Sequence, residues 1–158
     1  IRNSEYSAQD LVFNTEIKNL DRDALKKILF ASNVDASTLE SADFLPLYQA
    51  SPEFNISEIS GVTNIGEFSG QMLTKLSEVD SLPNDLNNPA FWLSKLSIDS
   101  KLTIGRELAS SLAAASPNVD QNMLDTILIK SSNGNYELRF MLKNSEALLN
   151  GIPLPIPL

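Results

Sequence analysis

Hydrophobic and polar residues alternate with a period of two along several segments of the chain. This period places every second side chain on the same face of a β-strand, so each segment is predicted to be a strand with one apolar face. In the first segment, for example, Leu11, Phe13, Thr15 and Ile17 share a face. The predicted strands are residues 9–19, 52–60, 67–76, 96–104 and 136–143, with a short last strand at 147–149.

Between these strands the apolar spacing changes to that of an α-helix. Asp21 can cap one helix, and Asn88 can cap a short helix that begins at Pro89 and carries Phe91 and Trp92. The other predicted helices are residues 36–50, 106–115 and 119–128, and the first of these is expected to be bent or broken by Pro46.

Turn signals join neighbouring strands into hairpins. Residues 61–66 are rich in turn formers, and Asn133-Gly134 favours a tight type I′ hairpin. Hairpins make antiparallel pairs, so the predicted fold class is α+β, a mostly antiparallel curved sheet of hairpin-linked strands with helices packed on one face. Residues 1–158 are expected to form a single domain. Residues 152–158 form a proline-rich tail, predicted to be extended or to add to a sheet edge.

Composition excludes several kinds of chemistry. The chain has no cysteine and no histidine, which excludes disulfides, thiol nucleophiles, the Ser-His-Asp triad and zinc sites built on Cys or His. Twelve basic against 20 acidic residues give a net charge of −8, which argues against nucleic-acid binding. No cofactor and no metal ion are predicted.

Carboxylates are the remaining candidates for catalysis. A glycosidase needs two of them flanking one bond, and the candidate pairs are Glu53 with Glu58, Glu67 with Glu78, and Asp120 with Asp125. All lie among polar, turn-prone neighbours, where no apolar surroundings would raise a carboxyl pKa. The prediction is therefore a protein that is not an enzyme, with a carboxylate-based hydrolase as the least favoured alternative.

Two groups of apolar residues are candidates for binding a ligand or a partner. One is a stripe on the central hairpin, and the other is an aromatic pair in the short helix. One interpretation is an ordinary core, in which the helix with Phe44 and Tyr48 covers the stripe and leaves it nearly inaccessible. The other is a hydrophobic surface that takes a partner or a lipid. The candidate residues are Phe54, Ile56, Phe68 and Met72 in the stripe, with Phe91 and Trp92 in the helix.

Four motifs, taken in order, resemble one bacterial family. They are the strand that leads into residues 19–25, the proline-started strand 51–56 with its return through Thr63 and Gly66, the run 102–104 directly before a helix, and the closing hairpin 136–154 with its Asn150-Gly151 ending. This order resembles the C-terminal part of the YdgA-like bacterial proteins of unknown function. The resemblance implies a periplasmic body on an N-terminal membrane anchor, and it carries over no catalytic residue.

The functional expectation combines these inferences. The chain is expected to be the C-terminal part of a longer anchored protein, periplasmic and tied to the inner membrane only through an anchor that these residues lack. It is expected to be non-catalytic and to act by association with a protein partner or with itself. The alternative is a lipid- or hydrophobic-ligand-binding module with a groove on the curved sheet.

Overall fold

The computed structural model describes residues 7–34, 37, 39–115 and 125–156. In these residues eight antiparallel strands form one open sheet in the order β1-β2-β3-β4-β6-β7-β8, with β5 paired to β6. The strands are β1 (Ala8–Lys18), β2 (Glu53–Thr63), β3 (Gly66–Leu76), β4 (Leu96–Ile104), β5 (Ile129–Lys130), β6 (Tyr136–Lys143), β7 (Glu146–Leu149) and β8 (Ile152–Leu154). The helices are α1 (Arg22–Val34), α2 (Ser41–Gln49), α3 (Pro89–Lys95) and α4 (Arg106–Ala115). The predicted α+β class and antiparallel sheet are confirmed.

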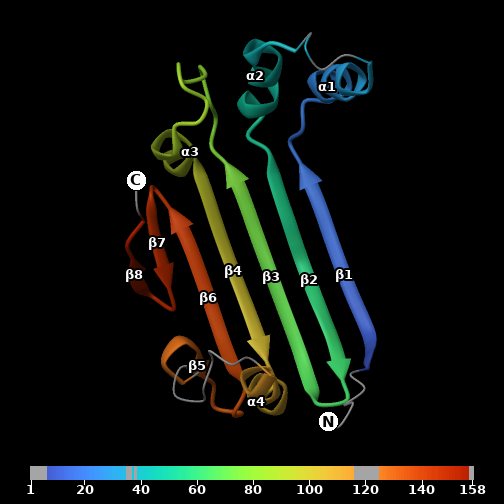
Figure 1. Ribbon diagram of the computed structural model, residues 1–158, viewed down its shortest axis with the longest axis vertical. Helices are drawn as coiled ribbons and strands as arrows, with labels where there is room; N and C mark the ends of the chain where they lie inside the picture. Colours follow the sequence, from blue (N-terminus) through green and yellow to red (C-terminus); the bar gives the residue numbers. More distant parts are fainter. Residues whose placement is uncertain (1–6, 35–36, 38, 116–124, 157–158) are drawn as a thin grey trace.

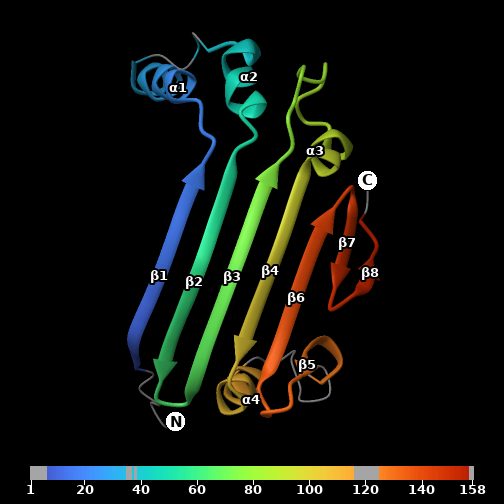
Figure 2. The same ribbon diagram turned by 180° about the vertical axis from the view of Figure 1, so that it is seen from behind.

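The helices lie at the two ends of the strands. α1, α2 and α3 lie at one end, and α4 lies at the other (Figures 1 and 2). In both views the middle of β1 to β6 is overlaid by no helix of the described residues. Fully buried Val79 lies in the loop after β3, at the α3 end, whereas most of the other buried side chains lie in α4 and the C-terminal strands. The latter include Leu108, Ala109, Tyr136, Leu142 and Ala147.

Capping side chains explain where the helices begin. Asp21 accepts a hydrogen bond at 2.8 Å from the amide of Ala24, and Asn88 caps α3 through the amides of Ala90 and Phe91. Both caps were predicted. The helix predicted from residue 36 begins later, at Ser41, because Glu40 and Asp43 form a capping box there.

The hairpins differ from their predictions in their turns. The β2–β3 turn is shorter than expected, because both strands continue through the glycines of residues 61–66. Only Gly134 of the Asn133-Gly134 pair has positive φ, so the loop between β5 and β6 is not a type I′ turn. It spans five residues instead and is closed by the Ser131 amide, which donates to the Asn135 carbonyl at 2.9 Å.

The C-terminal tail forms a strand. Ile152–Leu154 pairs with β7, so the tail adds to the sheet edge, one of the two predicted outcomes. Pro153 is tolerated because an edge strand needs hydrogen bonds on one side only. The helix predicted over residues 119–128 falls largely outside the described residues, which include its end at 125–127 in helical form.

Candidate binding surface

One face of the sheet is apolar across all of its long strands. The strand register aligns the apolar side chains in rows that cross the sheet, because residues directly opposite one another project from the same face. We call this surface the apolar face. Three of its rows are Ile17–Phe54–Thr74–Ile98–Leu142, Thr15–Ile56–Met72–Ser100–Phe140 and Phe13–Ile59–Gly70–Leu102–Leu138.

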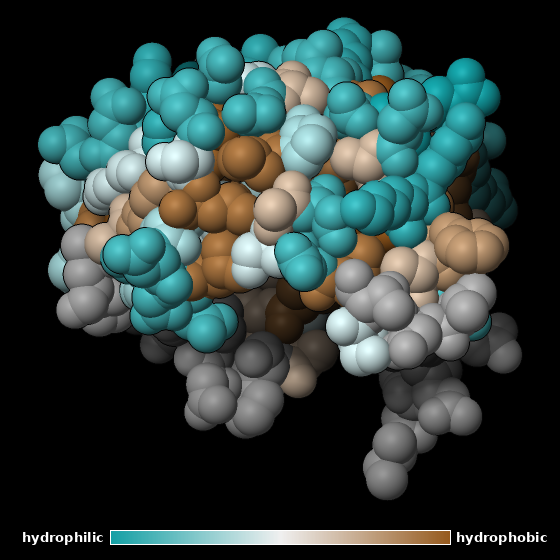
Figure 3. All heavy atoms as spheres, turned by 90° about the horizontal axis from the view of Figure 1, so that it is seen from above, coloured by the Kyte–Doolittle hydropathy of each residue, from teal (hydrophilic) through white to brown (hydrophobic). Residues whose placement is uncertain are grey.

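Exposure of the apolar face is lowest on β6, mostly intermediate on β2 to β4 and highest on β1. On β6, Tyr136 is 1% and Leu142 is 4% exposed, whereas Leu11, Phe13 and Ile17 on β1 are 66%, 63% and 58% exposed. In the end-on view of Figure 3, hydrophilic residues cover the upper side of the molecule and hydrophobic residues gather below them. The apolar face is therefore a core at one side of the sheet and a solvent-facing surface at the other.

The predicted stripe lies on the apolar face and is only half-buried. The register places Ile56 directly opposite Met72, so the expected sharing of one face is confirmed, with Phe54 and Phe68 on the same side. The expectation that α2 makes these four side chains nearly inaccessible is wrong. α2 lies beyond the end of β2 and packs beside α1, so it leaves the middle of the strands uncovered.

The aromatic pair occupies a different place, at the α3 end of the sheet. The Trp92 ring lies 5.0 Å from the Tyr48 ring of α2 and meets Phe91 edge-on, also at 5.0 Å between centroids. The indole Nε1 of Trp92 donates a 2.7 Å hydrogen bond to the Leu86 carbonyl. Phe44, Tyr48 and Trp92 help to line a pocket of about 260 Å³. These aromatic rings join α2 to α3 and the loop before it, which explains why α2 is held away from the stripe.

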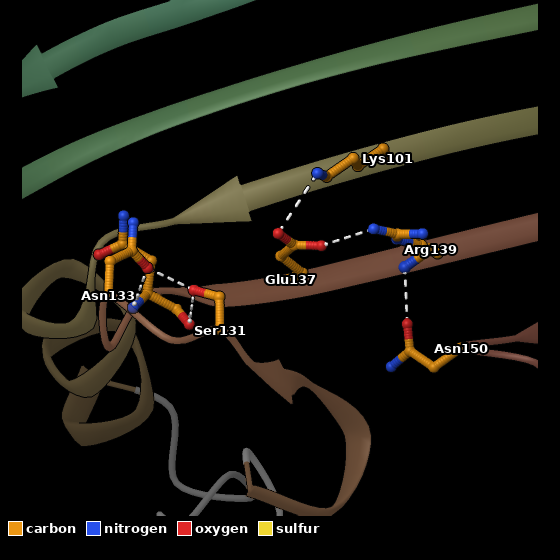
Figure 4. A network of polar contacts seen from close by, with 7 residues as sticks. Lys101, Ser131, Asn133, Glu137, Arg139 and Asn150 are labelled. Atoms are coloured by element: carbon orange, nitrogen blue, oxygen red, sulfur yellow. Dashed lines mark hydrogen bonds and ion pairs between the residues drawn. The ribbon is translucent and has the colours of Figure 1, made fainter.

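The opposite face of the sheet carries ion pairs, although one of its rows contains Leu73, Met141 and Leu148. Glu137 lies between Arg139 at 3.1 Å and Lys101 at 3.3 Å (Figure 4). Hydrogen bonds lower the pKa of Glu137 below its ordinary value, and the bond from Arg139 contributes more than the bond from Lys101. The backbone amide of Arg139 also donates to the Asn150 side chain at 2.7 Å. The network joins β4, β6 and the turn after β7 on the polar side.

Two of the candidate carboxylate pairs lie within the described residues, and their members have other partners or lie far apart. Glu53 is ion-paired with Lys75 at 2.7 Å, and Glu58 accepts a hydrogen bond from Asn14. Glu67 and Glu78 are separated by nearly the whole of β3, roughly 35 Å at about 3.3 Å per residue, too far to flank one bond. Asp120 lies outside the described residues. Within the described ranges, no group of three or more acidic side chains is placed to hold a metal ion.

The exposed residues of β1 were not among the predicted binding residues. Their alternation placed Leu11, Phe13 and Ile17 on one face, but alternation alone does not say whether a strand is central or at an edge. The order of the predicted elements does indicate that the first strand lies at an edge. The first strand leads into a helix rather than a tight turn, and no predicted hairpin joins it to a second strand.

Comparison with known proteins identifies a family. None of the helices in the described residues combines the length and apolar character that crossing a membrane requires. No curated protein and no solved structure matches this chain. Residues 5–157 match the model of a family described as a bacterial protein of unknown function (DUF945). The match extends over nearly the whole chain, which therefore belongs to this bacterial family of unknown function.

Proposed function

We propose that this domain is a non-catalytic binding module that associates with protein through the β1 side of its apolar face. One observation carries the proposal. Leu11, Phe13 and Ile17 are each more than half exposed and lie in one line on an edge strand. Contiguous exposed apolar surface of this kind is typical of interaction sites, because leaving it in water is unfavourable.

The rest of the apolar face supports the same function. Phe54, Ile56, Phe68 and Met72 continue the surface inward from β1, and all four are half-buried. Charged side chains lie on the other face, where Glu53 and Glu137 are held in ion pairs. A surface with an apolar centre and few charges is characteristic of the buried middle of protein interfaces.

A lipid or other hydrophobic ligand is the second candidate. The exposed line from Leu11 to Ile17 is about 20 Å long at roughly 3.3 Å per residue. That exceeds one leaflet's share of a bilayer core of about 30 Å, so an acyl chain could lie along it. The open shape of the sheet favours protein, because an enclosing cavity that buries most of a small ligand is the usual arrangement for ligand sites.

We also propose that the family is the YdgA-like one, and that the domain is the periplasmic part of an anchored envelope protein. The support is the order of the four motifs, from residues 19–25 to the Asn150-Gly151 turn. The helices lie at the ends of the strands, and where they contact the sheet they are proposed to do so on one face. In support, α4 buries Leu108 and Ala109, and the Leu108 backbone lies close to Gly66 of β3.

Site-specific photo-cross-linking tests the function. A photoreactive phenylalanine analogue replaces Phe13 on the apolar face or Asn14 on the polar face of the same strand, in protein expressed in a bacterial envelope. We expect a protein-sized adduct at position 13 that is weak at position 14 and is reduced by Ile17→Lys. A lipid-sized mass shift at position 13 would replace this proposal with the second candidate. Equal labelling at both positions would overturn both candidates.

A further inference from the structure

We propose that the partner of β1 is β1 of a second copy of this chain, paired antiparallel about a two-fold axis through Thr15. This inference rests on the proposed function and names the partner. The axis is perpendicular to the sheet, so the two sheets join edge to edge. In that arrangement the apolar faces of both copies lie on the same side.

The outer edge of β1 is available for pairing. Within the described residues β1 pairs with one strand, β2, and lies at the margin of the sheet (Figure 1). β1 is 11 residues long and contains no proline, so none of the residues whose backbone groups point to the outer edge lacks an amide donor. A long edge strand with an apolar face is the arrangement most prone to pair with another strand.

The geometry of β1 selects the register. One irregularity lies between Gln9 and Val12, where Asp10 has φ of 51°, so the strand is regular only after this point. The irregularity between Asn14 and Thr15 is an extra residue in β2 and leaves β1 itself continuous. The regular part of β1 therefore runs from Val12 to Lys18, and its midpoint is Thr15. Only the register centred there pairs the whole of this part with itself.

The apolar side chains match in this register. Phe13 lies opposite Ile17 of the second copy, Thr15 lies opposite its own counterpart, and Ile17 lies opposite Phe13. Aromatic with β-branched pairs and Thr–Thr pairs are among the favourable cross-strand combinations in antiparallel sheets. Phe13 and Ile17, which are exposed in one copy, therefore gain cross-strand neighbours in the pair.

The charges are also compatible. On the polar face Asn14 lies opposite Glu16 and Val12 lies opposite Lys18, so no like charges are directly opposed. The two Glu16 carboxylates are diagonal neighbours, and each is held by its own Lys18 at 2.9 Å. The registers centred on Glu16 or Lys18 would instead place two like charges directly opposite each other, which is destabilising.

Single-cysteine cross-linking tests the pairing. The chain has no cysteine, so Thr15→Cys introduces one thiol, which faces its own counterpart in the proposed register. Opposed residues in an antiparallel pair have Cα atoms about 4.5–5.5 Å apart, within the span of a disulfide. The matched control is Ser57→Cys, at an exposed residue of β2. Light scattering of the unaltered chain against concentration accompanies the oxidation.

We expect a dimer whose mass falls on dilution, and disulfide formation by Thr15→Cys at least ten times faster than by Ser57→Cys. Phe13→Cys or Ile17→Cys alone should cross-link no faster than the control, whereas a mixture of the two should form the mixed disulfide. A scattering dimer without rapid Thr15→Cys cross-linking would overturn this pairing but leave association through another part of the surface. A monomer at every concentration would overturn the second copy as partner, while the adduct at position 13 would still test the proposed function.

Discussion

Both edges of the sheet expose apolar side chains, but they differ in their capacity for hydrogen bonding. Ile152 on β8 is 65% exposed and Leu11 on β1 is 66% exposed. β8 is three residues long, contains Pro153 and is followed by Pro155, whereas β1 has 11 residues and no proline. A proline has no amide hydrogen, so it removes a donor from a strand edge. Apolar exposure alone therefore does not distinguish a protected edge from one that can pair.

The two sides also differ in how firmly they are packed. Ala147 is buried on β7, next to β8, and Tyr136 and Leu142 are buried on β6. All side chains of β1 other than Val12, which is partly covered, are exposed. The C-terminal side holds more of the buried side chains of the sheet, and the exposed N-terminal side is the one that we propose binds a partner.

The largest effect should come from removing the buried ring of Tyr136. Tyr136→Ala should lower the free energy of unfolding by about 3–5 kcal/mol, as expected for a buried aromatic side chain. Phe13→Ala, on the exposed edge, should lower it by less than about 1 kcal/mol in the monomer. Urea unfolding at low protein concentration measures both. Equal losses would contradict the proposed division of the sheet into a stabilising side and a binding side.

The second effect compares glycines in two turns. Gly66 has φ of 141°, and an added Cβ would lie 3.2 Å from the backbone nitrogen of Leu108. Gly66→Ala should therefore destabilise by about 3 kcal/mol, because backbone strain is combined with a close contact to a helix. Gly151 has φ of 82° with open space around it, so Gly151→Ala should lose only about 1 kcal/mol. Thermal unfolding distinguishes the two, and a larger loss at Gly151 would contradict the proposal that α4 packs against the β2–β3 hairpin.

Local patterns predicted the elements well where the controlling contacts are close in sequence. The bounds of β4 and α4 match because strict alternation ends at Ile104 and an alanine-rich helix follows Gly105. The cap at Asn88 was equally readable, since its partners are two and three residues away. The tail was harder to interpret, because Pro153 is compatible with a strand only at an edge, and edge position is a property of the whole sheet.

The exposure of the candidate binding surface is set by contacts between residues far apart in the sequence, which local patterns do not reveal. The face shared by Ile56 and Met72 followed from alternation within one hairpin. Whether α2 covers that face depends on where α2 packs. The contact between Tyr48 of α2 and Trp92, 44 residues later in the sequence, holds α2 at the end of the sheet. The exposed line on β1 was missed for the same reason, since strand order decides which strand lies at the margin.

The third prediction concerns the two prolines that limit strand pairing at the β8 edge. Pro153→Val with Pro155→Val should restore two amide donors and lower stability by no more than about 1 kcal/mol, through the greater freedom of the unfolded chain. Self-association should increase, because a second apolar edge can now pair. Light scattering against concentration measures this, with Pro83→Val in the loop after β3 as the control. Unchanged association would show that strand length, rather than proline, protects this edge.

The smallest expected change in stability depends on pH and compares an ion pair on β6 with an ion pair on β1. Hydrogen bonds from Arg139 and Lys101 lower the pKa of Glu137, so the folded state favours its ionised form. The stabilisation this provides is present above the unfolded value of about 4.5 and is lost as the pH falls through the lower folded pKa. Glu137→Gln should therefore be less stable than the unaltered chain at pH 7, with the difference vanishing in acid. Glu16→Gln removes one charge from the β1 pair with Lys18 and should change stability less. Urea unfolding at pH 7 and pH 3 checks both variants, and a Glu137→Gln difference that persists unchanged at pH 3 would show that its role is packing rather than charge.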